Sequence, residues 1–236
     1  MEKKYKLRED LTKEHNSITL YRVEALKDFG NVKKGELGGY IAKEYNLSQC
    51  GNCWVYDHAS VYGNAQVSGD AQVYNNARVY GNARVSEDAL LCYNVQVCGN
   101  AQVFGNVQVR GYVQIYGNAV VCGNAVVCGN AQVFGDVRVF ENAQVFENAQ
   151  VYGDALICGD AVITKKQDYY VGKNIWSSGR YFTYTRSNKM WRVGCFYGTG
   201  EELIEKAYKD SEVSGREYKR MVEYVEAMYN DLEKDK

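Results

Sequence analysis

Val61-Tyr62-Gly63-Asn64-Ala65-Gln66 is one copy of a six-residue pattern that decides the fold of this chain. The pattern continues in both directions without insertion or deletion, from residue 55 to residue 164. Place one of each unit holds Val, Leu or Ile, and place five holds Ala or Val. Place three is usually Gly, and place four is Asn or Asp in nearly every unit. Because four of the six places accept only a few residue types, every unit is expected to have the same conformation.

The period of the pattern identifies a solenoid. A helix repeats about every 3.6 residues and a strand about every two, so neither alone explains a period of six. Short units of this kind stack on their neighbours. The apolar residues at places one and five are expected to point inward, since each buried Val contributes about 1.5–3 kcal/mol. The Gly-Asn pair then turns the chain, because both residues tolerate positive φ.

The pattern resembles the hexapeptide-repeat superfamily of left-handed parallel β-helices, whose signature is an aliphatic residue at place one and a small residue at place five. The resemblance covers residues 55–164. It implies a mostly β protein in which three units, about 18 residues, make one triangular coil, with about six coils in all. It also implies a homo-oligomer, usually a trimer. The superfamily contains acyltransferases and non-catalytic members, and the fold does not decide between them.

The repeat divides the chain into three parts. Residues 1–48 are expected to form an N-terminal cap, because the open end of a solenoid presents unpaired strand edges. Residues 49–164 form the β-helix, and residues 165–236 form a small α+β domain. Within the first part, residues 21–41 resemble the lead-in of hexapeptide-like proteins encoded by bacteriophages and prophages. That resemblance implies a phage or mobile-element origin.

The part after residue 164 is predicted to contain three strands followed by two helices. Residues 168–171, 180–186 and 190–196 are rich in β-branched and aromatic residues. Capping boxes that begin at Thr199 and Ser214 each open a helix. The second helix carries an apolar stripe, which either docks on the strands or forms a short oligomerising coil.

The composition indicates the cellular compartment and which cofactors to expect. The chain has 236 residues, a formal net charge of -1 and no proline. It has no apolar run long enough to span a membrane and no signal-peptide core, so a cytoplasmic protein is expected, in the host cytoplasm if the protein is phage-encoded. Its 8 cysteines are expected to be reduced, with no disulfide, metal site or cofactor. The two histidines, His15 and His58, are too few for a three-histidine zinc site.

One face of the β-helix is predicted to carry a column of outward aromatic residues at place two of every third unit, interrupted by Cys98. Stacking along the sheet stabilises a solenoid, whereas an aromatic surface also marks subunit interfaces. Both interpretations remain open. The candidate interface residues are Tyr62, Tyr80, Tyr116, Phe134 and Tyr152.

A second candidate site is a basic and aromatic block after the repeat. Between residues 165 and 195, Lys and Arg strongly outnumber Asp and Glu. Positive charge beside aromatic rings suits a phosphate with a stacked base, and a strand places alternate residues on one face. The alternative is a solvated strand face that complements the acidic helices. The candidate ligand-binding residues are Arg180, Phe182, Tyr184, Arg186, Lys189, Trp191 and Arg192.

The enzyme question depends on His58. Acyl transfer in the superfamily that the repeat resembles uses a histidine base and a loop that protrudes from a coil. His58 follows Asp57, whose carboxylate would orient it, but it also lies at place four, a corner that tolerates His. The unbroken repeat leaves no protruding loop. His58 is therefore the one catalytic candidate, and a turn residue is the preferred interpretation.

Together these features favour a non-catalytic binding or scaffold protein of phage type. The β-helix would be an oligomeric support, and the C-terminal domain would meet a host macromolecule (protein or nucleic acid) or a nucleotide-like ligand, with counter-defence as one such role. The alternatives are a hexapeptide-family acyltransferase with His58 as base, and a structural component of a virion or its assembly.

Overall fold

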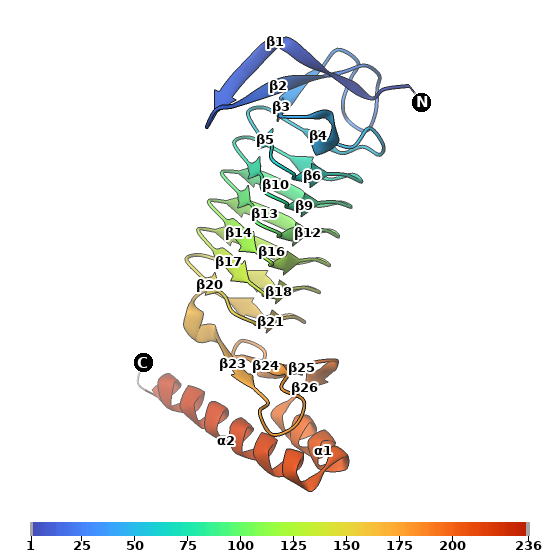
Figure 1. Cartoon of the computed structure of the whole chain (residues 1–236). Coiled ribbons are helices and arrows are strands. Elements are labelled where there is room, and N and C mark those ends of the chain that lie inside the picture. The colour runs from blue at the N-terminus through green and yellow to red at the C-terminus, as the bar shows by residue number, and fades with distance from the viewer. Residues whose placement is uncertain (1, 235–236) are drawn as a thin grey trace.

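The computed structural model describes residues 2–234, except for the side chain of residue 233. The molecule is a column of stacked coils with a β-hairpin at the N-terminal end and a unit of sheet and helices at the other end (Figure 1). In all three sheets of the column, strands of successive coils pair in parallel, which confirms the mostly β fold and the parallel β-helix predicted from the repeat.

The three sheets form the three sides of the column, and paired residues such as Asn64 and Asn82 are 18 residues apart. Three six-residue units therefore make one coil. The first sheet contains β3 (Leu37–Ile41), β5 (Ser60–Val61), β8 (Arg78–Val79), β11 (Gln96–Val97), β14 (Gln114–Gly117), β17 (Gln132–Gly135) and β20 (Gln150–Val151). The second contains β4 (Trp54–Val55), β7 (Gln72–Val73), β10 (Leu90–Tyr93), β13 (Gln108–Gly111), β16 (Val126–Gly129), β19 (Gln144–Val145) and β22 (Val162–Ile163). The third contains β6 (Gln66–Val67), β9 (Arg84–Val85), β12 (Gln102–Val103), β15 (Val120–Val121), β18 (Arg138–Val139) and β21 (Leu156–Ile157).

The column has one coil more than the repeat predicts. The second sheet has 7 strands, one for each coil. The first coil is built from residues 37–55, most of which lie in the segment expected to form the cap. In that coil β3 pairs in parallel with β5, Leu47 bridges Val67, and β4 pairs with β7. A short 3-10 helix, η1 (Glu44–Asn46), lies between β3 and the Leu47 bridge.

The core of the column is aliphatic and continuous. Residues at places one and five, such as Val61, Ala65 and Val97, have no exposed surface. They belong to one buried cluster that runs from Tyr5 to Tyr169. Because each buried Val contributes about 1.5–3 kcal/mol, this cluster is what holds the coils together.

The corners are built by places three and four, as predicted. At place three the backbone has positive φ: at Gly117 φ is +74°, and a Cβ there would lie 2.8 Å from the backbone N of Gly135 in the next coil. At place four the side chains bond from coil to coil. Asn82 Nδ2 donates to Asn100 Oδ1 at 3.0 Å, and Asn100 Nδ2 donates to Asn118 Oδ1 at 2.9 Å. Glycine therefore makes most of the turns, and asparagine or aspartate joins successive turns.

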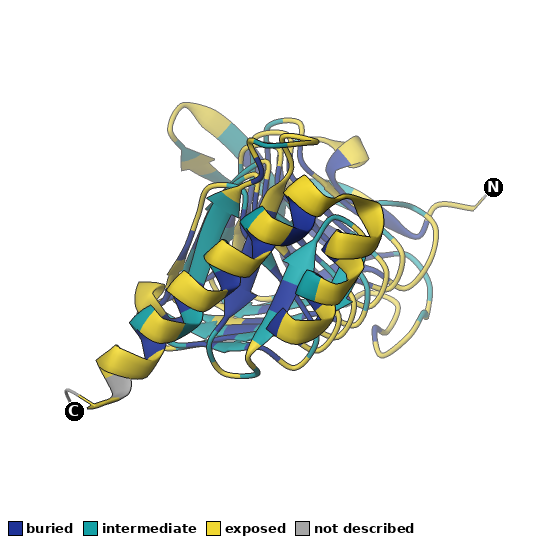
Figure 2. Cartoon of the chain, turned by 90° about the horizontal axis from the view of Figure 1, so that it is seen from below, coloured by how far each residue is buried: buried dark blue, intermediate teal, exposed yellow. Residues whose placement is uncertain are grey.

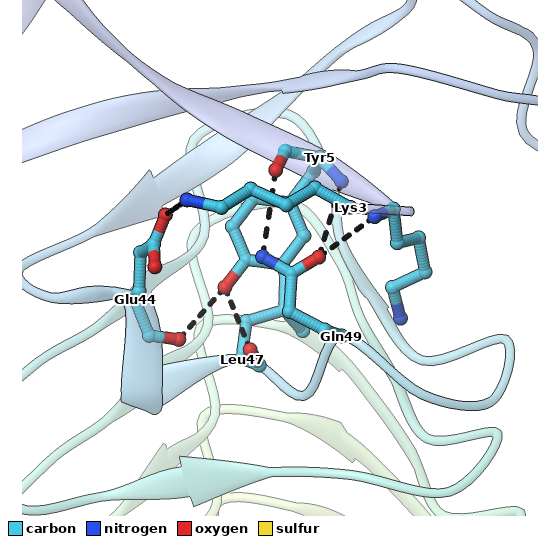
Figure 3. Close-up of polar contacts among 6 residues, drawn as sticks. Lys3, Tyr5, Glu44, Leu47 and Gln49 are labelled. Carbon is cyan, nitrogen blue, oxygen red and sulfur yellow. Dashed lines mark hydrogen bonds and ion pairs between the residues drawn. The ribbon is translucent and has the colours of Figure 1, made fainter. Parts of the chain in front are cut away.

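An antiparallel hairpin of β1 (Tyr5–His15) and β2 (Ile18–Ala25) covers the first coil. Figure 3 shows the Tyr5 hydroxyl between two backbone carbonyls, 2.7 Å from Glu44 O and 2.6 Å from Leu47 O. The Gln49 side chain reaches back to the hairpin, where its Oε1 accepts from the backbone N of Tyr5's neighbour, Lys4, at 2.8 Å. These bonds satisfy backbone groups for which no earlier coil exists.

Lys4 makes the deepest polar contact of this end. Its side chain is 1% exposed. The ammonium donates to the carbonyl of Gly51 at 3.2 Å, to the carbonyl of Cys53 at 3.0 Å and to Cys53 Sγ at 3.3 Å. Burial lowers the pKa of Lys4, and the neighbouring Cys53, Cys50 and Asp70 oppose that shift.

The C-terminal unit is a sheet with two helices packed on it. The 3-10 helix η2 (Lys166–Asp168) leads into an antiparallel sheet in the order β23 (Tyr169–Lys173), β24 (Tyr181–Thr185), β25 (Met190–Val193) and β26 (Phe196–Gly198). The short strand β26 is not predicted by the sequence. The helices α1 (Gly200–Asp210) and α2 (Glu212–Lys234) follow. Figure 2 shows both helices from below, with exposed residues on the outer side and buried residues facing the sheet.

One of the two predicted helix starts is confirmed and one is wrong. Thr199 and Glu202 form the capping box that opens α1. Ser214 does not open α2, because α2 already begins at Glu212. The Ser211 hydroxyl accepts from the backbone N of Ser214 at 3.1 Å, so Ser211 supplies the cap three residues earlier.

The C-terminal unit closes the last coil with side chains. In earlier coils, N–H groups donate to carbonyls of the next coil, as Arg138 N does to Ala155 O. In the last coil the equivalent donors meet side chains of the unit instead: Tyr152 N bonds Tyr169 OH at 3.2 Å, Leu156 N bonds Thr183 Oγ1 at 2.9 Å, and Val162 N bonds Ser187 Oγ at 2.7 Å.

Candidate functional site

The predicted aromatic column stacks on itself. The rings of Tyr62 and Tyr80 are 5.2 Å apart and nearly parallel, at 4°. On the other side of Cys98, the rings of Tyr116 and Phe134 are 4.9 Å apart at 1°, and those of Phe134 and Tyr152 are 5.5 Å apart at 18°. Stacking along the sheet is therefore observed. The role of these five residues as a subunit interface stays a prediction.

His58 has the surroundings of a corner residue. It is exposed, and its backbone N donates to Asn75 O at 3.0 Å, as other place-four residues do in their coils. The Asp57 carboxylate accepts from the backbone N of Asn75 at 3.1 Å. Within residues 2–234 no hydrogen bond joins that carboxylate to the His58 ring. The structure does not bring the two side chains together as a base and its orienting group.

The predicted stacking residues of the C-terminal unit are buried. Phe182 and Trp191 have no exposed surface, and Tyr184 is 3% exposed. They form a cluster with residues of α2 that include Val222 and Val225. The expectation that these three rings meet a ligand needs correction, because the apolar stripe of α2 docks on the same face of the sheet.

The basic candidates lie in three separate places. Arg180 lines a pocket between a loop and the helices. Arg186 and Lys189 line a groove where the unit meets the β-helix. The Arg192 guanidinium lies 5.3 Å from the centre of the Phe140 ring on the β-helix. The basic block is therefore not one surface.

The pocket that contains Arg180 lies within the C-terminal unit and has a volume of about 310 Å³. We call it the loop–helix pocket. It is formed by the β23–β24 loop, the β25–β26 turn, α1 and the first turns of α2. Its lining residues are Asn174, Ser177, Ser178, Arg180, Val193, Cys195, Phe196, Leu203, Lys206, Ala207, Asp210, Ser214 and Tyr218.

Asn174 fixes the loop over this pocket. Its side chain is buried, and Nδ2 donates to Ser177 Oγ at 3.0 Å and to Tyr218 OH at 2.9 Å. Oδ1 accepts from the backbone N of Ser177 at 2.9 Å, and the Asn174 N–H donates to Arg180 O at 2.8 Å. Asn174 thus joins the two ends of the loop through its backbone and links the loop to α2 through its side chain.

The lining of the pocket combines polar and apolar residues, and its charge is mixed. Arg180 and Lys206 supply two cations, and Asp210 supplies one carboxylate. Burial raises the pKa of Tyr218, while the Asn174 hydrogen bond and the positive charge of Arg180 oppose the rise. The Arg180 guanidinium approaches Gly194, where a Cβ would lie 3.1 Å from its Nη1. Arg180 is therefore held beside the pocket by the loop on one side and the β25–β26 turn on the other.

The second basic place is more open. We call it the junction groove; its volume is about 460 Å³, and it is lined by Val162, Thr164, Lys165, Asp168, Arg186, Ser187 and Lys189. The Asp168 carboxylate accepts from the backbone N and the hydroxyl of Thr164, both at 2.8 Å. The Arg186 guanidinium lies 5.8 Å from the centre of the Tyr229 ring. The groove therefore carries basic side chains, and the Asp168 carboxylate in its lining is engaged in hydrogen bonds that hold the local structure.

Sequence reasoning missed the other polar residues of the loop–helix pocket. Lys206 and Asp210 are one turn apart on α1, so they share a helix face. Ser177 and Ser178 lie in the loop that follows β23. The i, i+4 spacing of Lys206 and Asp210 is visible in the sequence. The meeting of that helix face with the loop depends on how α1 packs against the sheet, which no local pattern gives.

Comparison with known proteins supports the fold and leaves the activity open. A family model described as the YdcK beta-solenoid repeat matches residues 71–87, 77–93 and 113–129. A protein of Escherichia coli (strain K12) described as "Uncharacterized acetyltransferase YdcK" is 39% identical over 57 residues. That match covers 24% of this chain and 17% of the length of the E. coli protein. Both matches fit the hexapeptide-repeat β-helix superfamily.

Among residues 2–234, no helix is long and apolar enough to cross a membrane. The longest, α2, is amphipathic, and residues such as Tyr218 and Val225 on its apolar side are buried against the sheet.

Proposed function

We propose that this protein is a non-catalytic binding protein whose loop–helix pocket takes a small phosphorylated ligand of nucleotide type. The observation that carries the proposal is the convergence of Arg180 and Lys206 with the hydroxyl groups of Ser177 and Ser178 in one cavity of about 310 Å³. Ligand sites are generally concave, with volumes of roughly 300–1,000 Å³ and a few placed polar groups.

The chemistry of the lining supports this ligand class. Two cations and two hydroxyl donors suit the oxygens of a phosphate, because charge-assisted hydrogen bonds are about twice as strong as neutral ones. Asp210 is an acceptor on the same wall and suits a sugar hydroxyl. Phe196, which is half-buried, adds an apolar surface for a base. A macromolecule is a poorer fit, since the lining is concave and small.

In this proposal the β-helix is the support for the C-terminal unit. Its corners and core are occupied by structural requirements, and the stacked aromatic column supplies a flat face for self-association. A homotrimer is proposed by likeness to the superfamily, with Tyr62, Tyr80, Tyr116, Phe134 and Tyr152 at the interface.

The setting we propose is the cytoplasm of a bacterial host. The support is the resemblance of residues 21–41 to segments of phage-encoded hexapeptide-like proteins. A phage protein that holds a nucleotide-like signal would lower its free concentration without catalysis. Counter-defence is the role that such sequestration would serve.

Calorimetry with purified protein tests the proposal. Nucleoside mono-, di- and triphosphates and inorganic phosphate are titrated into the wild type. Arg180→Gln and Lys206→Gln should each weaken binding by about tenfold, because a hydrogen bond to a charged group contributes about 1.5–3 kcal/mol. Lys189→Gln in the junction groove is the control and should leave affinity unchanged. Failure of every nucleotide to bind the wild type would overturn the proposal.

An acetyltransferase is the second candidate, because the E. coli relative is described as an acetyltransferase. In that case His58 would be the base. Turnover of acetyl-coenzyme A by the wild type that is lost in His58→Ala would establish it. The exposed corner position of His58 and the bond of Asp57 to the next coil support the non-catalytic proposal instead.

A further inference from the structure

A third cavity lies on the outer face of the third sheet, where the β-helix meets the C-terminal unit. We call it the face groove; its volume is about 450 Å³. Its floor comes from β12, β15, β18 and β21, and one wall comes from β25 and the turn after it. The lining residues are Gln102, Phe104, Val120, Cys122, Arg138, Phe140, Leu156, Arg192 and Gly194.

The floor of this groove is apolar only in the coils next to the C-terminal unit. Place two of this face reads Ser68 and Ser86 in earlier coils, and then Phe104, Cys122 and Phe140. Place six changes in the same way, from Gln66, Arg84 and Gln102 to Val120 and Leu156, with Arg138 between them. A structural repeat does not require this change, since the inward residues are the same along the whole column. The change therefore points to a contact made at this end of the face.

Two arginines stand over the apolar floor. Arg138 is exposed on β18. Arg192 is half-buried, its guanidinium covers the Phe140 ring, and its Nε is buried with no hydrogen-bond partner in the structure. In the described part of the chain neither arginine forms an ion pair with a carboxylate. Buried N–H donors usually have a hydrogen-bond partner. The unpaired Arg192 Nε is therefore available to a ligand that carries an acceptor.

Two acidic residues, Glu87 and Glu141, act electrostatically on Cys122 in this groove. Glu141 raises the pKa of Cys158 and of Cys122, so its charge reaches the groove, although burial is the main cause of both shifts. Its carboxylate accepts from the backbone N of Gly159 at 2.7 Å. That bond holds the Glu141 carboxylate at the corner, and among the described residues neither Glu87 nor Glu141 forms an ion pair with Arg138 or Arg192.

We propose that the face groove binds an amphipathic organic anion. Its apolar body packs on Phe104, Val120 and Phe140, and its carboxylate or phosphate accepts hydrogen bonds from Arg138 and Arg192. The site exists only when the C-terminal unit is docked on the β-helix, because Arg192 comes from one part and the floor from the other. It shares no lining residue with the loop–helix pocket.

Fluorescence titration of the whole protein with 8-anilinonaphthalene-1-sulfonate, an amphipathic anion, provides the first measurement. Decanoate should displace the dye, and decanol, which has the same chain without the charge, should not. Arg138→Gln should weaken both ligands by about tenfold, as expected for loss of a charge-assisted hydrogen bond. Arg84→Gln is the matched control, because Arg84 holds place six of the same face three coils away among polar residues.

A second variant tests the apolar floor. Cys122 lies between Phe104 and Phe140 in the column of place two, so Cys122→Phe should fill the groove and abolish dye binding, with the melting temperature checked for both variants. Equal binding by wild type, Arg138→Gln and Arg84→Gln, displacement by decanol as effective as by decanoate, or no binding by the wild type would each overturn the proposal. Phosphatidylglycerol vesicles distinguish a free anion from a lipid surface. Binding to the vesicles without binding of free decanoate would also overturn the proposal.

Discussion

At the scale of residues, single side chains decide how the β-helix stops. Lys4 and Tyr5 donate to carbonyls of the first coil, and Tyr169, Thr183 and Ser187 accept from N–H groups of the last. A sheet that ends without partners leaves backbone groups unpaired and invites another chain. These residues take the place of the neighbouring coil.

Replacement of Lys4 by Met should lower the free energy of unfolding by about 1–3 kcal/mol, because the buried carbonyls of Gly51 and Cys53 lose their donor. Urea unfolding measures the change. Lys3→Met is the adjacent control: its ion pair with Glu44 is exposed and should contribute less than about 1 kcal/mol. Equal stability of the two variants would show that the Lys4 contacts do not stabilise this end.

Residue-level prediction from the sequence was good where one environment repeats and poor where it does not. The burial of Val61 and Ala65 follows from their places in the unit. The burial of Phe182, Tyr184 and Trp191 does not, since an aromatic residue on a strand is compatible with either face of the sheet. Only the docking of α2 decides which face is covered, and that is a long-range contact.

At the scale of elements, the corner is the unit that repeats most strictly. Gly117 and Gly153 have the same φ, +74°, at the same place of the unit. They differ in their surroundings: a Cβ on Gly117 would lie 2.8 Å from Gly135 N, and a Cβ on Gly153 would meet nothing within 4 Å. Alanine substitutions at these two glycines therefore distinguish two losses of stability: the strain of a side chain in the left-handed conformation, and the clash with the next coil.

Gly153→Ala should cost about 1–2 kcal/mol, the strain of a side chain in the left-handed region. Gly117→Ala should cost more than that, because the next coil must also move. Differences in melting temperature, measured on both variants under the same conditions, give the comparison. Equal losses would mean that the coils yield freely at the corner.

The elements that the sequence failed to predict are those without a periodic signature. The first coil, residues 37–55, closes through η1 and a single bridge at Leu47, and so lacks the six-residue pattern. Strand β26 has three residues and pairs with β25 after a short turn. Likewise the loop–helix pocket and the face groove are made where separate elements meet. Each gains one cation, Lys206 on α1 or Arg192 on β25, from an element whose packing no local pattern fixes.

At the scale of the whole molecule, buried tyrosines make stability depend on pH. Burial raises the pKa of Tyr229 to about 12, whereas a tyrosine in the unfolded chain titrates near ~10. The folded state therefore keeps a proton that the unfolded state loses, and stability falls as pH rises from about 10 to 12.

Tyr229→Phe should reduce that dependence. Between pH 8 and 11 the loss of unfolding free energy should be smaller than in the wild type by about 1 kcal/mol, the value of one proton over one pH unit. Urea titrations at both pH values measure it. Tyr224→Phe, an exposed tyrosine on the same helix, should leave the wild-type dependence in place. A steeper dependence in Tyr229→Phe would contradict the argument.

Because both ends of the column are closed, the number of coils sets the distance between the two terminal parts. The N-terminal hairpin and the C-terminal unit stand at opposite ends of the coils (Figure 1), and each coil separates them by roughly the strand spacing of 4.8 Å. Duplication or loss of one 18-residue stretch would change the spacing by one such step and leave both ends intact. Evolution can thus set the distance between the two terminal parts in fixed increments, without redesigning either of them.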